Sequence, residues 1–160
     1  MFKSSAMNHW LFKSEPDTFS FADLKKRRSE PWSGVRNYQA RNYMRDSMRV
    51  GDTGFCYHSA CAEPGVAGVL RVVSEPYDDP TQFDPKSEYF DAKATLEKPR
   101  WQLVDVAWEA DFKRFVPLSA LKSDPALEGL LTLRPGNRLS ITPVSGEHFQ
   151  HIFRLGGLKG

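Results

Sequence analysis

Short segments in which apolar and polar residues alternate recur along the chain and predict strands. Four of them are rich in β-branched and aromatic residues: "HWLFK" (9–13), "TGFCYHS" (53–59), "GVAGVLRVVSEPY" (65–77) and "NRLSITPV" (137–144). The stretch "WQLVDVAWEADFKRFV" (101–116) sends successive side chains to opposite faces, which predicts one long strand or two strands joined near residues 109–111. Because short helices interrupt these strands without a regular alternation of strand and helix, we expect a single domain of mainly β structure with short helices, arranged as a small barrel.

Helices are predicted where a capping residue precedes a stripe of apolar side chains. Ser20 can cap a helix together with Asp23, and Ser145 can cap a C-terminal helix that ends at Gly156. A short helix is expected within "PLSALKSDP" (117–125). A further helix begins near Asn37 and places residues spaced by four on one buried stripe: Ala40, Met44 and Met48.

The limits of the folded part follow from where these patterns start and stop. At 160 residues the chain has the length of one domain with a single core. We expect a flexible lead-in over residues 1–7, a domain over residues 8–157 and a tail over residues 158–160. The polar, proline-containing segment 78–99 is predicted to be a surface loop, and Gly65 and Gly68 mark a bulge or a close approach of two backbones.

Composition places the chain among ordinary globular proteins, with 40% hydrophobic and 26% charged residues. No apolar run is long enough to span a bilayer and the first residues lack the apolar core of a signal peptide, so we expect no membrane association and a cytoplasmic location. Cys56 and Cys61 are accordingly expected to be reduced thiols. The net charge is only +2, but residues 1–50 carry 10 Lys and Arg against 5 Asp and Glu, which predicts one localised positive face.

The segment "PWSGVRNYQARNYMR" (31–45) combines an aromatic residue on a turn with a basic helix. Trp32 either fills a small apolar cluster or serves as a platform on which a base stacks. The predicted helix brings Arg41, Arg45 and Arg49 into one row, which suits phosphate binding; the alternative is a solvated face with local ion pairs such as Arg45 with Asp46. Asn37 either caps this helix or presents its amide to the edge of a base.

Metal binding and catalysis find little support in the sequence. Cys56, His58 and Cys61 supply only three ligands at a spacing that is unusual for zinc, so we expect no metal and no other cofactor. The chain has no nucleophile elbow, phosphate-binding glycine loop or His-Glu-x-x-His motif. Glu15 and Asp105 are a conceivable pair of carboxylates, but nothing in the sequence brings them together, and we predict no catalytic residue.

Several long segments resemble the EVE-domain family. They are "WLFKSEPDTFSFADL", "WSGVRNYQARNYMR", "VGDTGFCYHS", "GVAGVLRVVSEPYDDPTQFDP", "LVDV" and "RLSITPVS", which cover nearly the whole chain from His9 to Gly157. The resemblance implies a PUA-like barrel with short helices and a relationship to the YTH domains. It also implies a non-catalytic module that binds nucleic acid and recognises a modified base, notably 5-methylcytosine or an oxidised derivative in DNA, flipped into an aromatic pocket.

The same resemblance assigns the pocket to particular residues. By motif, the base-binding residues are Ser14, Glu15, Trp32, Asn37, Tyr57, His58 and Ser140. Separately from the resemblance, we expect Arg36, Arg41 and Arg45 to bind phosphates. The two cysteines and the long 84–100 loop depart from the family pattern, and we expect neither to touch the pocket residues.

Two other functions stay open at this point. PUA-like barrels also bind RNA, so a modified RNA is an alternative ligand. A third interpretation, from a different class, is an enzyme that acts on a modified nucleoside with Glu15, His58 or Asp105 as acid or base. The preferred modification, the biological process and the oligomeric state are not encoded in any pattern that we recognise.

Overall fold

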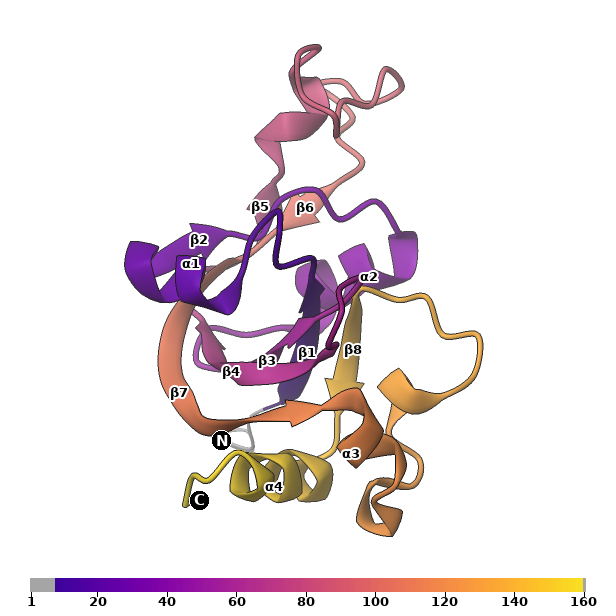
Figure 1. Cartoon of the computed structure of the whole chain (residues 1–160). Helices are drawn as coiled ribbons and strands as arrows, with labels where there is room; N and C mark the ends of the chain where they lie inside the picture. The colour runs from indigo at the N-terminus through magenta and orange to yellow at the C-terminus, as the bar shows by residue number, and fades with distance from the viewer. Residues whose placement is uncertain (1–7, 160) are drawn as a thin grey trace, which may run out of the picture.

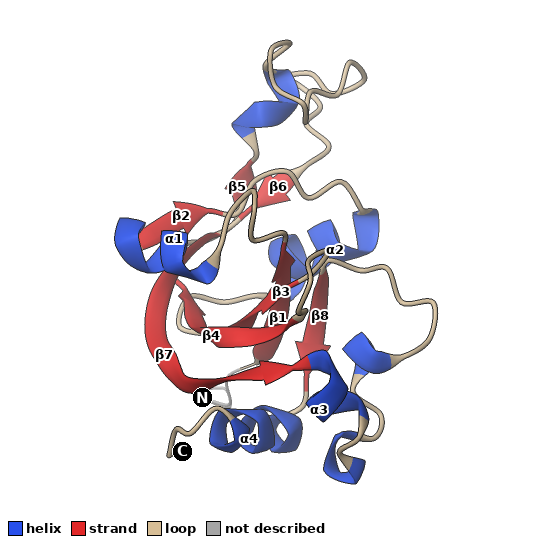
Figure 2. Ribbon diagram, in the orientation of Figure 1, coloured by secondary structure: helices blue, strands red, loops and turns tan. Residues whose placement is uncertain are grey.

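A curled six-stranded sheet forms the centre of the protein (Figures 1 and 2), seen in a computed structural model that describes residues 8–159. The predicted lead-in over residues 1–7 and the final residue of the predicted tail lie outside this range. The strands of the sheet are β1 (His9–Ser14), β2 (Ser29–Pro31), β3 (Thr53–His58), β4 (Gly65–Val72), β7 (Asp105–Pro117) and β8 (Ile141–Val144). They are ordered β2-β7-β4-β3-β1-β8, with β1 and β3 parallel and the other neighbours antiparallel. The predicted barrel of mainly β structure is confirmed as a half-barrel.

Alternation along the strands separates two apolar clusters, one on each face of the sheet. Phe12 and Cys56 belong to the first cluster, whereas Leu11, Phe55 and Tyr57 belong to the second. The register pairs Leu11 with Phe55 and Phe12 with Cys56, so residues of one face lie side by side. Phe55 and Tyr57 therefore lie on the same face of the sheet.

Local helix signals work as predicted at both ends of the chain. Ser20 and Asp23 form a reciprocal capping box at α1 (Phe21–Arg27), and Ser145 accepts from the His148 N–H at the start of α4 (Gly146–Leu155). A further short helix, α3 (Leu118–Lys122), follows β7 within the predicted segment. Figure 1 shows α4 across the end of the sheet that lies opposite the projecting insertion. None of the helices within residues 8–159 is long and apolar enough to cross a bilayer.

The helix after Asn37 is shorter and less regular than predicted. α2 covers Tyr38–Asn42 and continues as one π-helical turn over Tyr43–Ser47, after which Met48 is extended. Ala40, Met44 and Met48 are buried as expected. Because the helix ends at Ser47, Arg49 falls in the following turn and does not extend a row of helical arginines.

The sequence predicts a bulge or a close approach of two backbones at Gly65 and Gly68. The structure has a close backbone approach at Gly65, where a Cβ would lie 2.3 Å from the Val116 carbonyl oxygen, and a register shift beside Gly68. The pairing of β4 with β7 shifts register between Val66 and Gly68, and a Cβ placed on Gly68 would lie 2.2 Å from Cζ of Phe21. A side chain at this position would therefore push α1 away from the sheet.

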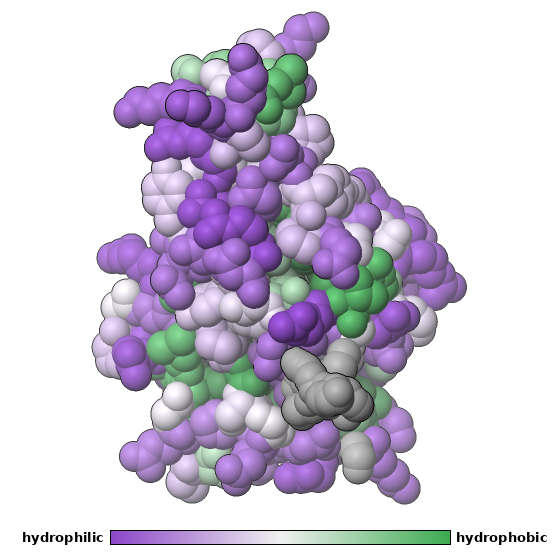
Figure 3. Space-filling view, turned by 180° about the vertical axis from the view of Figure 1, so that it is seen from behind, coloured by the Kyte–Doolittle hydropathy of each residue, from purple (hydrophilic) through white to green (hydrophobic). Residues whose placement is uncertain are grey.

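The segment predicted as a surface loop forms an ordered insertion that projects from the barrel (Figure 1). It starts and ends in a two-stranded ribbon of β5 (Tyr77–Asp78) and β6 (Gln102–Leu103), and it contains a 3₁₀ turn over Pro80–Phe83. The fully buried Gln82 side chain accepts from the backbone N–H groups of Arg100 and Trp101 and donates to the carbonyl oxygens of Asp79 and Trp101. The two ends of the insertion are thereby held together. Seen from behind, the insertion has a mostly hydrophilic surface (Figure 3).

Candidate functional site

A cavity of about 490 Å³ lies at the end of the barrel from which the insertion projects, and we call it the Trp32 cavity. Its volume is within the range of about 300–1,000 Å³ that is usual for small-molecule sites. The structure brings together in its lining five of the residues predicted from the sequence: Ser14, Glu15, Trp32, Arg36 and Ser140. They come from the end of β1, from the loop after β2 and from the residue before β8, so distant parts of the chain meet here.

Trp32 is part of the core as well as of the cavity. Only 8% of the residue is exposed, and its ring makes edge contacts with Phe12 at 5.3 Å and Phe19 at 6.1 Å between centroids. Its backbone N–H donates to the Val104 carbonyl oxygen at 2.9 Å. Of the two roles predicted for Trp32, packing in an apolar cluster is present, because β1 and the turn before α1 supply its neighbours. The indole therefore forms a fixed wall of the cavity rather than a projecting platform.

Tyr89 of the insertion also lines the cavity. Gly34 has a φ of +89°, and a Cβ there would lie 2.7 Å from atoms of the Tyr89 ring. The Arg36 guanidinium donates to the Tyr89 carbonyl oxygen at 2.7 and 3.1 Å. Since Glu88 and Tyr89 line the cavity with Trp32, the expectation that the 84–100 loop does not touch pocket residues is wrong. The chain returns to the barrel at this point, which the linear sequence does not reveal.

Arg36 is occupied by bonds within the protein. Besides Tyr89, it donates to the carbonyl oxygen of Val35, to the carboxylate of Asp79 at 3.1 Å and to the hydroxyl of Thr81 at 3.0 Å. All five of its N–H donors are used in this way. Arg36 therefore joins the 31–36 loop to the insertion, and its predicted phosphate-binding role would require it to give up one of these bonds.

Asp79 is the buried centre of this junction. Its side chain is 1% exposed, and it accepts from the Gly34 N–H at 2.8 Å, from Arg36, and from the N–H and hydroxyl of Thr81. A buried carboxylate with four donors and a cationic partner holds the surrounding backbone in one arrangement. The sequence-based analysis missed Asp79; its position before Pro80-Thr81 indicated only a cap of a local turn.

The polar groups inside the cavity differ in how they are used. Ser14 donates its hydroxyl to the Phe19 carbonyl oxygen, and the Lys13 N–H donates to the Ser140 carbonyl oxygen at 2.8 Å. The Glu15 carboxylate and the Ser140 hydroxyl form no hydrogen bond with other residues of the described range 8–159. Burial lowers the pKa of Lys13, a lining residue that was missed although it adjoins Ser14 in sequence. The cavity thus offers a carboxylate acceptor and a hydroxyl to a ligand, whereas the Lys13 ammonium lies over the ring of Tyr57, 5.9 Å from its centroid.

Three predicted pocket residues are placed elsewhere. Asn37 is exposed and caps α2 by accepting from the Ala40 N–H at 3.0 Å, which is the first of its two predicted roles. Tyr57 is 4% exposed within the second apolar cluster, on the face of the sheet opposite to Phe12. His58 accepts from the Phe21 N–H through Nε2 at 3.0 Å, and burial lowers its pKa. The structure does not bring these three residues into the Trp32 cavity.

The arginines of the 41–45 segment make local contacts. Arg45 forms two hydrogen bonds with the Asp46 carboxylate at 2.8 and 2.9 Å, so the local ion pair that the sequence offered as an alternative is present. Arg41 donates to the carbonyl oxygen of Arg100 at 2.7 Å and to the side chain of Asn42. Arg45 remains exposed, whereas Arg41 is half-buried.

The groups considered for catalysis or metal binding are dispersed. Asp105 accepts from the Tyr77 hydroxyl at 2.6 Å and is absent from the Trp32 cavity, which contains Glu15. Cys56 is buried and Cys61 is half-buried, and both are free thiols. Within residues 8–159, no three His, Cys, Asp or Glu side chains are grouped so that they could hold a metal ion.

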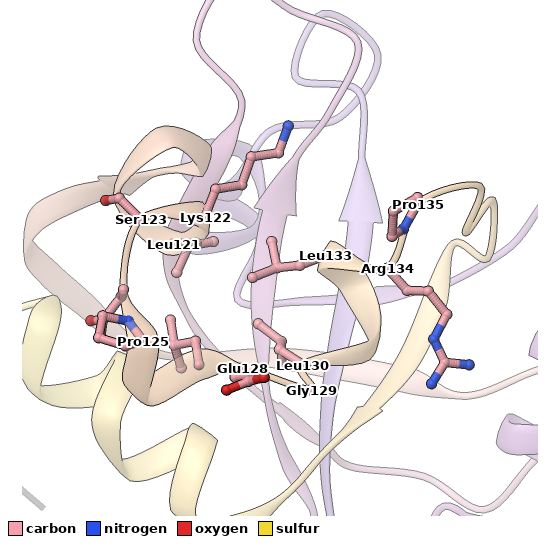
Figure 4. A pocket seen from close by; sticks show the side chains of 12 residues that line it. Leu121, Lys122, Ser123, Pro125, Glu128, Gly129, Leu130, Leu133, Arg134 and Pro135 are labelled. Carbon is pink, nitrogen blue, oxygen red and sulfur yellow. The ribbon is translucent and has the colours of Figure 1, made fainter.

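A second cavity, of about 730 Å³, lies at the opposite end of the barrel, and we call it the Leu121 cavity (Figure 4). All of its lining residues come from the segment 121–135, in which only Ala126, Leu131 and Thr132 do not line the cavity. Figure 4 shows Leu121, Leu130 and Leu133 directed toward its interior, whereas Arg134 extends away. None of the base-binding or phosphate-binding residues predicted from the sequence lines this cavity.

Comparison with known proteins decides the family. The family described as EVE domain matches residues 8–155. The chain belongs to the EVE-domain family. Among its relatives, human thymocyte nuclear protein 1 is 41% identical over 166 residues, which cover 92% of this chain and 73% of the human protein.

Solved structures of EVE-domain relatives share the fold. A protein from Pseudomonas syringae is 47% identical with a TM-score of 0.89, covering 92% of this chain and 99% of its own. Human THYN1, in a complex with DNA that contains 5-methylcytosine, is 38% identical with a TM-score of 0.89, covering 96% and 99%. A YTH domain of Zygosaccharomyces rouxii, in complex with N6-methyladenosine RNA, has a TM-score of 0.56 at 14% identity and is similar in fold alone. The PUA-like architecture expected from the sequence agrees with these neighbours.

Proposed function

We propose that this EVE-domain protein is a non-catalytic reader of modified DNA, which binds a flipped 5-methylcytosine or an oxidised derivative in the Trp32 cavity. One observation carries the proposal: three distant segments of the chain place an aromatic wall and unpaired polar groups around one hollow of suitable size. The DNA complex of the human relative, with the same fold at 38% identity, supports the choice of ligand.

The polar groups of the cavity match the edge of cytosine. Carboxylates accept from the exocyclic amine of cytosine, and Glu15 provides such an acceptor. The ring nitrogen and carbonyl oxygen of cytosine are acceptors, and the Ser140 hydroxyl can donate to one of them. A base that presents the opposite pattern would leave these groups unpaired, and this gives stronger discrimination than shape alone.

The free energy of binding must come partly from the cavity and partly from the surrounding surface. Extracting a base from a duplex costs a few kcal/mol, and stacking returns about 1–3 kcal/mol per base. The methyl group adds only about 0.8 kcal/mol on burial. Net affinity must therefore come from phosphate contacts, for which Arg41 and the exposed Arg45 are the proposed residues. Arg45 would exchange its bond with Asp46 for one with a phosphate.

The proposal is tested by changing Glu15 and measuring binding to oligonucleotides with one modified or unmodified cytosine. Glu15→Gln replaces one acceptor oxygen by a donor, so we expect about a tenfold loss of affinity for the modified DNA. Asp17→Asn is the matched control, because Asp17 is exposed in the same turn and does not line the cavity. Equal binding of modified and plain DNA by the unchanged protein would refute the proposal.

The same measurement separates the alternative ligands and activities. Matched RNA oligonucleotides are included, and tighter binding to modified RNA than to modified DNA would replace DNA as the proposed partner. Mass spectrometry of the oligonucleotides after incubation reports on turnover. An altered base in the product would refute the non-catalytic assignment.

A further inference from the structure

Tyr38 presents an exposed aromatic ring next to the wall of the Trp32 cavity. It is the first residue of α2, and 45% of it is exposed. Its ring stacks on that of Trp101 with a centroid distance of 4.7 Å and an interplanar angle of 17°. Trp101 in turn lies 5.4 Å from the Arg36 guanidinium, which lines the cavity. A continuous series of flat groups therefore leads from the cavity to the surface.

The ring behind Tyr38 is held firmly. Trp101 is 6% exposed, and its indole N–H donates to the Asp91 carboxylate at 2.8 Å. Its backbone N–H and carbonyl oxygen are both bonded to the buried Gln82 side chain. Because Trp101 is fixed, a ligand that stacks on Tyr38 would meet a ring whose orientation is set in advance.

Tyr38 is 45% exposed, so part of its ring remains accessible beside the guanidinium groups of Arg41 and Arg100. The Arg41 guanidinium lies 4.7 Å from the Tyr38 centroid and 5.9 Å from that of Trp101. A guanidinium on the outer face of Tyr38 would lie nearly two stacking distances from the Trp101 centroid. Arg41 is closer to Trp101 than that, so it lies beside the stack of the two rings. Arg100 bonds to the Tyr38 hydroxyl and is likewise at the rim of the ring.

Positive charge surrounds this accessible part of the ring. Arg41 and Arg100 both lie within 6 Å of the ring centre, at 4.7 and 5.7 Å. Burial lowers the pKa of Arg41, and the neighbouring charges of Arg45 and Arg100 act in the same direction. Two carboxylates offset part of this charge, since Asp46 pairs with Arg45 and Asp91 with Arg100. Three guanidinium groups against two carboxylates leave the surface positive.

We propose that the outer face of Tyr38 is a stacking site for a second, unpaired base, with Arg41 and Arg100 placed beside the phosphates of the same strand. Aromatic rings with neighbouring arginines bind single-stranded nucleic acid in this manner. A paired base has both faces covered by its neighbours in the duplex, so this site selects nucleotides that are single-stranded or unstacked. That the Tyr38 site lies next to an everted base rests on the function proposed above. Its binding of single strands does not depend on that function.

The test compares Tyr38→Ala with the unchanged protein on plain single-stranded DNA of about 12 nucleotides, a length that covers an ordinary site. We expect Tyr38→Ala to weaken this binding about tenfold, the usual effect of removing one stacked ring. Binding to a blunt duplex of the same sequence changes by less than about twofold, because a paired base cannot stack there. Tyr38→Phe keeps the ring and preserves single-strand binding.

A control for loss of any surface aromatic is Tyr77→Ala, because Tyr77 is 41% exposed and stacks on no aromatic residue within residues 8–159. Thermal unfolding shows whether each variant is folded, and Tyr38→Leu, which keeps apolar cover over Trp101, replaces Tyr38→Ala if the latter unfolds. Unchanged single-strand affinity in Tyr38→Ala or Tyr38→Leu overturns the stacking site even when the unchanged protein discriminates modified bases. Conversely, a loss in these variants upholds the stacking site even when no discrimination is found.

Discussion

The Trp32 cavity and the Leu121 cavity lie at opposite ends of one barrel and are built in different ways. The Leu121 cavity is larger, at about 730 Å³ against about 490 Å³, but one continuous stretch of chain forms it and leucines cover its floor. The Trp32 cavity joins three distant segments and the insertion, and it contains unpaired polar groups. Recognition of a flat polar ligand needs fixed donors and acceptors, so the way a cavity is assembled is more informative than its volume.

The two cavities also differ in how their walls are fixed. A buried carboxylate, Asp79, joins the walls of the Trp32 cavity through Gly34, Arg36 and Thr81. Near the Leu121 cavity the corresponding link is a half-buried pair, His151 with Asp124 at 2.6 Å. Removing either link tests which end of the barrel is held by its polar contacts.

The largest effect is expected from Asp79→Ala. Asp79 is the buried member of this junction, and its loss leaves the donors of Gly34, Arg36 and Thr81 without their acceptor, which should reduce the free energy of unfolding by about 3–5 kcal/mol. Asp124→Ala, at the other end of the barrel, should destabilise much less, because water can replace the partner of a half-buried group. Chemical denaturation of both variants measures the difference, and equal losses would contradict the asymmetry between the ends.

A glycine pair gives a second comparison with the same backbone geometry. Gly34 and Gly129 both have a φ of +89°, but a Cβ on Gly34 would meet the Tyr89 ring at 2.7 Å whereas one on Gly129 meets nothing within 4 Å. Each substitution to alanine incurs backbone strain of about 1–3 kcal/mol. Gly34→Ala should in addition displace Tyr89 and weaken binding of modified DNA. If both variants bind alike, Tyr89 is not a wall of the functional site.

Exposed arginines at the two ends test where nucleic acid binds. Arg45→Ala should weaken binding to every sequence and lower the slope of log K against log salt by about one, since one phosphate contact is lost. Arg134→Ala removes an equally charged exposed side chain at the Leu121 cavity and should leave this slope unchanged. Titrations at several salt concentrations distinguish these outcomes. A larger change for Arg134→Ala would place the nucleic acid at the wrong end for our proposal.

The smallest expected effect is a dependence of stability on pH. Burial lowers the pKa of His58 below 6.5, so its neutral form is favoured in the folded protein, and stability is lost as pH falls from about 6.5 through the lowered pKa. His9 is shifted in the same direction by burial. His58→Gln keeps an acceptor for the Phe21 N–H and should reduce the fall in melting temperature between pH 7.5 and 5.5. The Asp124–His151 hydrogen bond lowers the pKa of Asp124, so that carboxylate affects stability only at lower pH.

Local chemistry explains which parts of the fold were predictable. Ser20, Asp23 and Ser145 cap helices through contacts within a few residues, and alternation along β1 and β3 separates the two faces. Such signals are complete within a short window of sequence. The half-barrel and the capping helices could therefore be predicted before the structure was known.

The site was predictable only where motif residues happen to share one end of the barrel. Tyr57 is within the same motif as His58 but points to the other face, and neither lines the Trp32 cavity. Tyr89 enters the cavity because Gln82 and Asp79 fold the insertion back, and these contacts join residues far apart in the chain. A linear motif does not contain this information, so neither the position of Tyr89 nor the bonds between Arg36 and the insertion could be predicted from the sequence.

The Gln82 amide bonds to both ends of the insertion, and this makes the projecting segment an exchangeable module. Residues beyond that junction can be shortened, lengthened or grafted from another protein without pulling on the barrel strands. The insertion supplies Tyr89, which lines the cavity, and Trp101, on which Tyr38 stacks. Exchanging the insertion is therefore a direct way to change the proposed base preference.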